Sequence, residues 1–420
     1  MSPALGADGD IVTSTSTWSS SGRGSNRNGP HAAAVEFRHP AGTAGVPFGA
    51  AVDAGAGVAT GGRAGRATAL RVAVGAGWVG AVRAPSRPHA TARQTRTAAT
   101  TLVRIRGVYH DRMPKKILGT DLPPSVTIVE VGPRDGLQNE PRAVPTEVKV
   151  ELIERLAEAG LGVVEATSFV NPAWVPQLAD AGDVLERLDR RPGVRYPVLV
   201  PNERGLDRAL EAKVEEIAIF ASATEAFSQR NLNRSRDEAI EMFRPVTQRA
   251  TQQGMRVRGY LSMVLGDPWE GDVAASAVVE AGLRLLDLGC FELSLGDTIG
   301  VGTAGAVETL IDAFASSGVG AQTLAVHFHD TYGQGLANVL AALICGVSVV
   351  DASAGGLGGC PFAKSATGNL ATEDVVWMLD GLSVSTGVDL RKVAAASAWV
   401  CEKLDKPIPG RVASALRPGR

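Results

Sequence analysis

The sequence predicts an α/β protein built as a (β/α)8 TIM barrel with a disordered N-terminal extension. Three observations support this prediction. From residue 126 onward, short apolar runs rich in β-branched residues alternate with longer amphipathic stretches. Eight such pairs fit into roughly 250 residues, the usual size of this barrel. Polar residues also follow the ends of several runs, and in a parallel barrel these ends share one mouth.

The composition limits the class of protein. The chain has 420 residues, 45% of them hydrophobic, which is enough for a large buried core. A net charge of −2 argues against a nucleic-acid partner. No apolar run reaches the roughly 18 residues of a membrane-spanning helix, so no membrane partner is expected. The four cysteines lack the spacing of a disulfide scaffold or a zinc knuckle, which indicates a reducing cytosol.

Residues 1–120 are expected to be a disordered, low-complexity extension. They are rich in Ala, Gly, Ser, Thr, Val and Arg, and no lysine occurs before Lys115. Such a segment cannot bury enough apolar surface to offset the entropy of ordering it. It could be a transit peptide, a functional disordered tail, or upstream sequence read from a start site placed too early. We favour the last, with Met113 as the true start, because avoidance of lysine is typical of translated GC-rich DNA.

Residues 124–410 form the predicted catalytic domain. Strands are expected at residues 126–131, 162–167, 196–200, 216–221, 256–262, 286–293, 323–328 and 347–351. Helices are expected at 146–159, 236–253, 272–281, 305–314, 335–345 and 372–379. A doubly wound open sheet is the alternative. No Gly-x-Gly-x-x-Gly fingerprint follows the first strand, so we favour the closed barrel.

His327 and His329 are candidate metal ligands. Because side chains alternate along a strand, both point to the same side at the end of the seventh strand. An isolated His-x-His pair is more often packed or on the surface, so other ligands are needed. Asp135, after the first strand, is the natural third, although an Asp-Gly turn would also explain it. Completion by Asn369 and water favours Mg²⁺ or Mn²⁺, with zinc and cobalt as alternatives.

Four further residues are candidates for the chemistry. Arg134, beside a ligand, suits a substrate carboxyl or a developing oxyanion, or a structural salt bridge to Glu165. Glu165 lies on an apolar strand and must therefore be buried and paired. Asp297 suits a role near the metal, as a base, or as a helix cap. Cys360, in a Gly-rich loop, is either an acid or base on a lid or an incidental small residue.

Several motifs resemble those of the hydroxymethylglutaryl-CoA lyase family, TIM-barrel metallolyases with an Arg-Asp-Gly-x-Gln motif. They lie at residues 131–140, 168–170, 327–333, 355–361 and 368–374. The resemblance spans about residues 124–410. Related synthases, which condense acetyl-CoA with 2-oxo acids, carry Glu where this chain has Leu137 and typically Asn-Asp where it has Asp330-Thr331. The resemblance therefore favours cleavage over condensation.

The resemblance implies a role for each candidate residue. Asp135, His327, His329 and Asn369 would bind the metal, Arg134 would stabilise an enolate, Glu165 would be its partner, Cys360 the flap thiol, Asp297 an active-site acid, and Gln138 and Ser168 would line the site.

The implied reaction is cleavage of 3-hydroxy-3-methylglutaryl-CoA to acetyl-CoA and acetoacetate, as in leucine degradation, dependent on a divalent metal, Mg²⁺ or Mn²⁺. The implied enzyme is a cytoplasmic homodimer with an acyl-CoA as its small-molecule partner. The alternatives are a lyase for a longer 3-hydroxy-3-alkylglutaryl-CoA, a condensing synthase, and a catalytically dead scaffold barrel. Retention of Asp135, His327 and His329 argues against the last.

Overall fold

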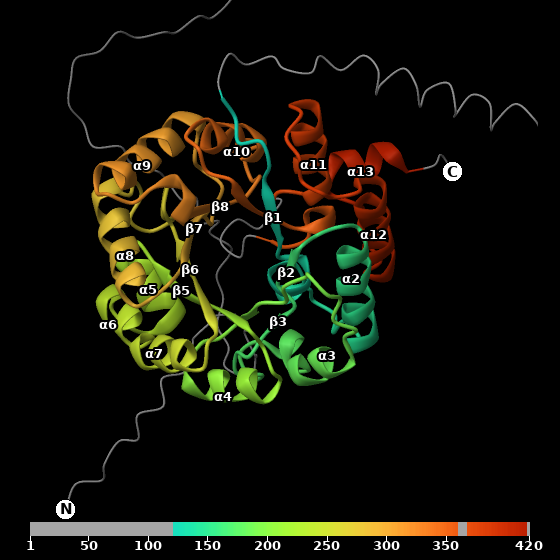
Figure 1. The fold of residues 1–420 in the computed structure, drawn as a ribbon, viewed down its shortest axis with the longest axis horizontal. Coiled ribbons are helices and arrows are strands. Elements are labelled where there is room, and N and C mark those ends of the chain that lie inside the picture. Colours follow the sequence, from blue (N-terminus) through green and yellow to red (C-terminus); the bar gives the residue numbers. More distant parts are fainter. Residues whose placement is uncertain (1–120, 360–367, 418–420) are drawn as a thin grey trace, which may run out of the picture. The chain divides into compact units, whose positions relative to one another are not determined.

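The computed structural model describes residues 121–359 and 368–417. The predictions on residues 1–120 and on Cys360 lie outside this range. The described part folds as a ring of helices around a curled parallel sheet (Figure 1). None of its helices combines the length and the hydropathy needed to span a membrane.

The strands pair in parallel and close into a barrel, which confirms the predicted fold. Their order is β2-β1-β9-β8-β7-β6-β5-β4-β3. The two ends of this order, β2 and β3, are consecutive parts of one barrel strand. Between them, Glu165 N donates to Glu130 O on one side and Ala166 N donates to Pro197 O on the other, both at 2.9 Å. The bounds are β1 Thr127–Glu130, β2 Val163–Val164, β3 Thr167–Ser168, β4 Val198–Leu199, β5 Glu216–Ser222, β6 Arg256–Ser262, β7 Glu292–Asp297, β8 Leu324–Phe328 and β9 Val349–Ala352.

The helices form the outer layer of the barrel. They are α2 Thr146–Glu158, α3 Ala181–Arg187, α4 Glu203–Glu211, α5 Glu225–Leu232, α6 Arg236–Glu241, α7 Arg244–Gln252, α8 Ala275–Asp287, α9 Ala304–Ser316, α10 Gly335–Ile344, α11 Thr372–Gly381, α12 Leu390–Lys403 and α13 Arg411–Leu416. Helix α12 packs beside α2, where the Arg155 guanidinium lies 4.6 Å from the centre of the Trp399 ring.

The structure corrects several of the expected bounds. The strand expected at 286–293 is wrong in its first part, because α8 runs on to Asp287 with Leu285 buried on its inner face. Gly289, at φ 101°, then turns the chain, and β7 begins only at Glu292. The helix expected at 236–253 is two helices, α6 and α7, and the second begins with proline in its first turn. Helices α3, α4, α5, α12 and α13 were not predicted.

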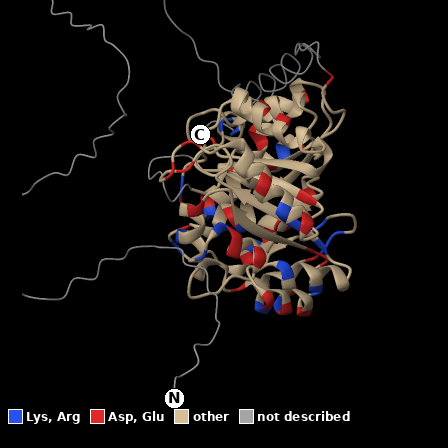
Figure 2. Ribbon diagram, turned by 90° about the vertical axis from the view of Figure 1, so that its left-hand side faces the viewer, with Lys and Arg blue, Asp and Glu red and all other residues tan. Residues whose placement is uncertain are grey.

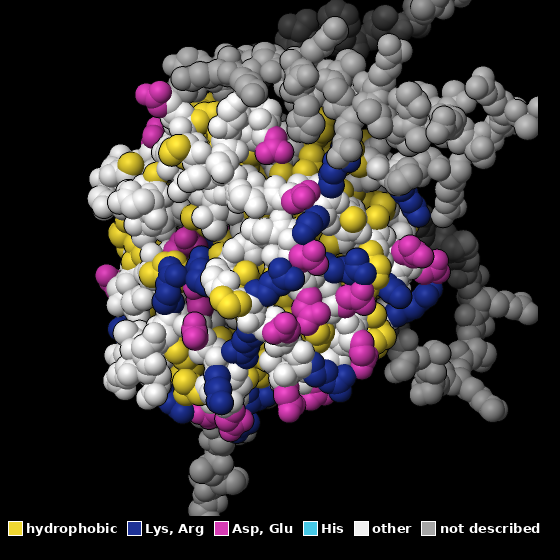
Figure 3. Space-filling model, turned by 45° about the vertical axis from the view of Figure 1, so that its right-hand side comes forward, with side chains coloured by type: hydrophobic (Ala, Val, Ile, Leu, Met, Phe, Trp, Pro, Cys, Tyr) yellow, Lys and Arg dark blue, Asp and Glu magenta, His cyan; other side chains and the backbone are white. Residues whose placement is uncertain are grey.

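Charged residues of both signs are interspersed along the outer helices (Figure 2). On the face shown in Figure 3, basic and acidic groups alternate without a stripe of one sign. The barrel interior also holds fully buried charges, among them Arg258, Asp351 and Glu165.

Candidate metal centre and active site

A π-helical turn, η1 (Gly132–Gly136), carries Arg134 and Asp135 directly after β1. The amides of Asp135 and Gly136 both donate to Val131 O, at 2.7 and 3.1 Å. Glycine is required at the end of the turn. A Cβ on Gly136 would lie 2.8 Å from Ser353 Oγ and 2.9 Å from Leu357 Cβ, so only glycine allows the turn to pack against the loop after β9.

Asp135, His327 and His329 form a cluster that could hold a metal ion. Their potential ligand atoms lie within 4.8 Å of one another. Asn369 joins them: its Nδ2 donates to Asp135 Oδ2 at 2.8 Å and to Leu357 O at 3.1 Å. The site therefore draws its residues from η1 after β1, from the end of β8 and from the segment that follows β9. The structure brings together all four residues expected to bind the metal.

The protonation of this cluster suits a cation. Burial would raise the pKa of Asp135, but the Arg134 charge and nearby His327 hold it at about 2. Burial, reinforced by His327, lowers the pKa of His329 to about 4. At neutral pH the cluster thus offers a carboxylate and a neutral imidazole, the forms that bind metals. Nδ1 of His329 is buried and has no hydrogen-bond partner among the described residues, which fits a site completed by an ion.

Arg134 links the metal cluster to a buried acid. Its Nη1 donates to Asp135 Oδ1 at 2.6 Å, and its Nε donates to Glu165 Oε2 at 2.7 Å. The Tyr260 hydroxyl donates to the same Oε2 at 3.1 Å. The expected buried and paired state of Glu165 is therefore confirmed, with both Arg134 and Tyr260 as partners. Tyr260 lies on β6, and its place in this network was not predicted from the sequence.

The remaining candidates lie around the same mouth but make mainly backbone contacts. Asp297 is fully buried, and its carboxylate accepts from Val301 N at 3.1 Å and Gly302 N at 2.8 Å. Burial raises its pKa. Ser168 is also buried and donates to Leu199 O at 3.1 Å. Gln138 is half-buried just after η1.

Two buried acids beside the site were not singled out from the sequence, namely Glu130 at the end of β1 and Asp351 on β9. Glu130 accepts from Gly132 N and Ala354 N, at 2.8 and 2.9 Å, and so ties η1 to the loop after β9. Asp351 contacts His327, with Oδ2 3.3 Å from Nδ1. Both residues show the signal that identified Glu165, an acid on an apolar strand.

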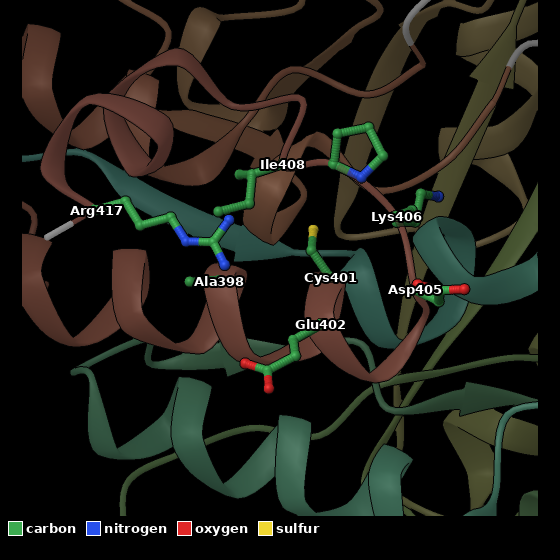
Figure 4. Close-up of a pocket in the computed structure, with 8 residues that line it drawn as sticks. Ala398, Cys401, Glu402, Asp405, Lys406, Ile408 and Arg417 are labelled. Atoms are coloured by element: carbon green, nitrogen blue, oxygen red, sulfur yellow. The ribbon is translucent and has the colours of Figure 1, made fainter. Parts of the chain in front are cut away.

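A separate pocket of about 310 Å³ lies between α12 and α13 (Figure 4). None of the candidate site residues that the structure describes lines it. Its lining comprises Ala398, Cys401, Glu402, Asp405, Lys406, Pro407, Ile408 and Arg417.

Comparison with known proteins identifies the family. Residues 125–400 match the family described as HMGL-like. The chain belongs to the HMGL-like family. A bovine relative named "Hydroxymethylglutaryl-CoA lyase, mitochondrial" is 53% identical over 293 residues, which cover 70% of this chain and 90% of that protein. A zebrafish relative named "3-hydroxy-3-methylglutaryl-CoA lyase, cytoplasmic" is 54% identical over 297 residues, covering 70% of this chain and 88% of its own.

Solved structures of HMGL-like proteins agree with this assignment. The hydroxymethylglutaryl-CoA lyase of Pseudomonas aeruginosa is 52% identical, with a TM-score of 0.69, covering 70% of this chain and 98% of that one. An HMG-CoA lyase from Acinetobacter baumannii, solved with coenzyme A and 3-methylmalate, is 34% identical, with a TM-score of 0.66, and covers 71% of this chain and 98% of its own. The family resemblance inferred from the motifs is confirmed.

Proposed function

We propose that this protein cleaves 3-hydroxy-3-methylglutaryl-CoA to acetyl-CoA and acetoacetate. The observation that carries the proposal is the Asp135–His327–His329 cluster with Arg134 bonded to its carboxylate. The names of relatives above 50% identity support the substrate. Retention of the cluster argues against a dead scaffold barrel.

The proposed cofactor is Mg²⁺ or Mn²⁺, held by Asp135, His327, His329 and the amide oxygen of Asn369. Two imidazole nitrogens, one carboxylate and one amide oxygen, without a thiolate, suit such an ion. When bound, the ion would polarise the tertiary hydroxyl and the free carboxylate of the substrate and orient them for bond cleavage.

The chain's own residues would move the proton and stabilise the charge. A base, Asp297 or Cys360, takes the proton of the tertiary hydroxyl. As the hydroxyl carbon becomes the ketone of acetoacetate, the electrons of the broken C–C bond pass into the thioester as an enolate. Arg134, held by Glu165, stabilises that oxyanion. Protonation of the enolate carbon, with Cys360 as the candidate acid, releases acetyl-CoA.

The proposed setting is a cytoplasmic homodimer. Relatives are named both cytoplasmic and mitochondrial, so localisation of the tagged full chain decides between these compartments. Gln138 and Ser168 are proposed to line the acyl-CoA site. The oligomeric state can be checked by light scattering of the purified chain.

The direct test is acetoacetate release by the purified full chain. We expect turnover of 3-hydroxy-3-methylglutaryl-CoA with Mg²⁺ or Mn²⁺, and loss of turnover in EDTA that returns when the ion is restored. Turnover of a longer 3-alkyl analogue without turnover of the methyl substrate would replace the proposed substrate. Absence of turnover with both would overturn the lyase proposal.

A further inference from the structure

Asp351, on β9, is a fully buried carboxylate beside a proposed metal ligand on the neighbouring strand. Asp351 and His327 are register partners in the β8–β9 pair. Nδ1 of His327 lies 3.3 Å from Asp351 Oδ2, and this nitrogen is buried without a regular hydrogen bond to any described residue. Asp351 is therefore an acceptor within reach of the imidazole.

Two neighbouring side chains fix the orientation of the Asp351 carboxylate. Arg258 donates through Nη2 to Oδ1 at 2.7 Å and through Nη1 to Oδ2 at 3.1 Å. Ser294 donates its hydroxyl to Oδ2 at 2.7 Å. Because both carboxylate oxygens accept hydrogen bonds from these donors, the carboxylate cannot rotate freely. Its Oδ2 therefore faces His327 as a fixed hydrogen-bond acceptor.

We propose that Asp351 is a positioning residue that keeps the proton of His327 on Nδ1, so that Nε2 presents its lone pair to the divalent ion. A neutral imidazole carries one proton, and the hydrogen bond made by one nitrogen decides which nitrogen is free to bind a metal. The inference rests on the proposed metal centre and adds a residue outside its ligand set.

The competing explanation is that Asp351 serves only to neutralise buried Arg258. Glu292 allows the two explanations to be separated. It accepts from Arg258 Nε at 2.6 Å, yet it lies four residues before Gly296, the register partner of His327 on β7. Replacing Glu292 therefore perturbs the same arginine without touching the imidazole.

The test compares the full chain with its Asp351→Asn and Glu292→Gln variants. In Asp351→Asn the amide oxygen would accept from Arg258, so the amide N–H₂ group would face His327. Because this group is a donor, it would favour the His327 tautomer with its proton on Nε2. Long-range ¹H–¹⁵N NMR of histidine-labelled, metal-free protein reports the tautomer. The chain has only six histidines, and a His327→Gln variant assigns the signal.

The second readout is Mn²⁺ affinity, measured by calorimetry on the same proteins. We expect the wild type and Glu292→Gln to hold the Nδ1–H tautomer and to bind Mn²⁺ within about twofold of each other. Asp351→Asn should shift the tautomer and bind about 10- to 100-fold more weakly. Should Asp351→Asn fail to fold, Ser294→Ala carries the test, because it removes one bond to Oδ2 and should weaken Mn²⁺ binding by about 2- to 10-fold.

An unchanged tautomer with unchanged Mn²⁺ affinity in Asp351→Asn, or in Ser294→Ala if that variant carries the test, would overturn the inference. So would an equal loss of affinity in Glu292→Gln, which would assign the effect to the charge of Arg258. Failure of the proposed function looks different: the wild type itself would release no acetoacetate, whatever the tautomer and the Mn²⁺ affinity of Asp351→Asn.

Discussion

Arg134 lies between the proposed metal ligand Asp135 and the buried acid Glu165, and these contacts hold its positive charge in a fixed position. Its Nη1 and Nε are bonded to Asp135 and Glu165. The side chain is 8% exposed, so its remaining edge can meet a substrate while its charge stays largely unscreened by water. A fixed cation at this point suits an oxyanion that appears only as the C–C bond breaks.

We predict that Arg134→Gln lowers kcat by about a hundredfold to a thousandfold or more, because an enolate would lose its cation. Mn²⁺ affinity should change little, since the ligand set is intact. Acetoacetate release and Mn²⁺ titration measure the two effects. Arg244→Gln, which removes an exposed guanidinium on α7, is the control and should retain full activity. Near-normal turnover in Arg134→Gln would refute its assignment.

Glu130 predicts a pH dependence of stability. Burial raises its pKa to about 7, although bonds from Thr372, Ala354 and Gly132 lower it. The folded protein thus holds this proton more tightly than the unfolded chain does, since a free Glu has a pKa near 4.3. This contribution to stability is complete below the unfolded pKa and is lost as pH rises through about 7.

The neutral isostere Glu130→Gln should remove this loss. Its amide oxygen can accept from Gly132 and Ala354 while its N–H₂ donates to the Thr372 hydroxyl. Relative to wild type, we expect the free energy of unfolding of the variant to rise by about 1–3 kcal/mol between pH 5 and pH 8. Urea unfolding at both pH values gives the difference. Glu151→Gln, at a side chain that is 46% exposed, should show no such gain. Identical pH profiles for wild type and Glu130→Gln would contradict the prediction.

At the residue scale, sequence reasoning found side chains but not their distant partners. Glu165 was expected to be buried because it is an acid on an apolar strand, and Arg134 was named as a partner. The Arg258–Asp351 pair, 93 positions apart, was not foreseen, nor was the Thr372–Glu130 bond across 242 positions. Such pairings follow from barrel closure, which no local pattern of residues records.

At the scale of single elements, η1 explains how Arg134 and Asp135 reach the mouth together. In this turn the backbone amides of Asp135 and Gly136 both donate hydrogen bonds to one carbonyl oxygen, Val131 O. The sequence placed Arg134 and Asp135 after the first strand but did not predict the π-helical winding. Likewise, the leucines at 285–288 fit a strand as well as a helix by periodicity alone, and only packing decides between them.

We predict that Gly136→Ala disturbs the metal centre through this element. The new methyl group would lie 2.8 Å from Ser353 Oγ and 2.9 Å from Leu357 Cβ, so η1 and the loop after β9 must separate. Asn369, which donates to both Asp135 and Leu357 O, would then lose one of these bonds. We expect Mn²⁺ affinity and kcat each to fall about tenfold or more, on the scale of lost second-layer contacts around a metal.

Gly182→Ala supplies the matched control for that change. Gly182 lies in α3, where a Cβ meets no atom within 4 Å. Alanine there should leave Mn²⁺ affinity and kcat unchanged and should stabilise the helix slightly. Mn²⁺ titration and acetoacetate release on both variants provide the comparison. Equal behaviour of the two variants would exclude the proposed role of η1 packing.

At the scale of the whole molecule, the alternation of strand and helix limited the fold to a closed barrel or an open, doubly wound sheet. The closed ring was reached by excluding a nucleotide-binding fingerprint, not from direct evidence of closure. Closure itself depends on the strand that contains Glu165, whose amide bonds toward β1 while the next amide, Ala166, bonds toward Pro197. The hydrophobic pattern of a sequence does not show that one strand pairs with different neighbouring strands along its length.

The position of the candidate ligands in the ring leads to a final prediction. They come from the end of β1, from β8 and from the segment after β9, and these three strands are neighbours in the order β1-β9-β8. A bound ion would therefore brace the seam where the first part of the barrel meets the last. Mn²⁺ at about 100 times its Kd should add about 2.7 kcal/mol to the free energy of unfolding. For a domain of this size that corresponds to a rise in Tm of about 3–8 °C, reversed by EDTA. The Asp135→Asn variant should lose this rise because it lacks the ligand carboxylate.

Hydrogen exchange should localise the effect. Amides of β1 and β9 should gain more protection on Mn²⁺ binding than the overall rise in the free energy of unfolding accounts for. Amides between β5 and β6, on the far part of the sheet, should gain only the protection that this overall rise provides. A uniform gain across all strands would mean that the ion stabilises the barrel without bracing this seam.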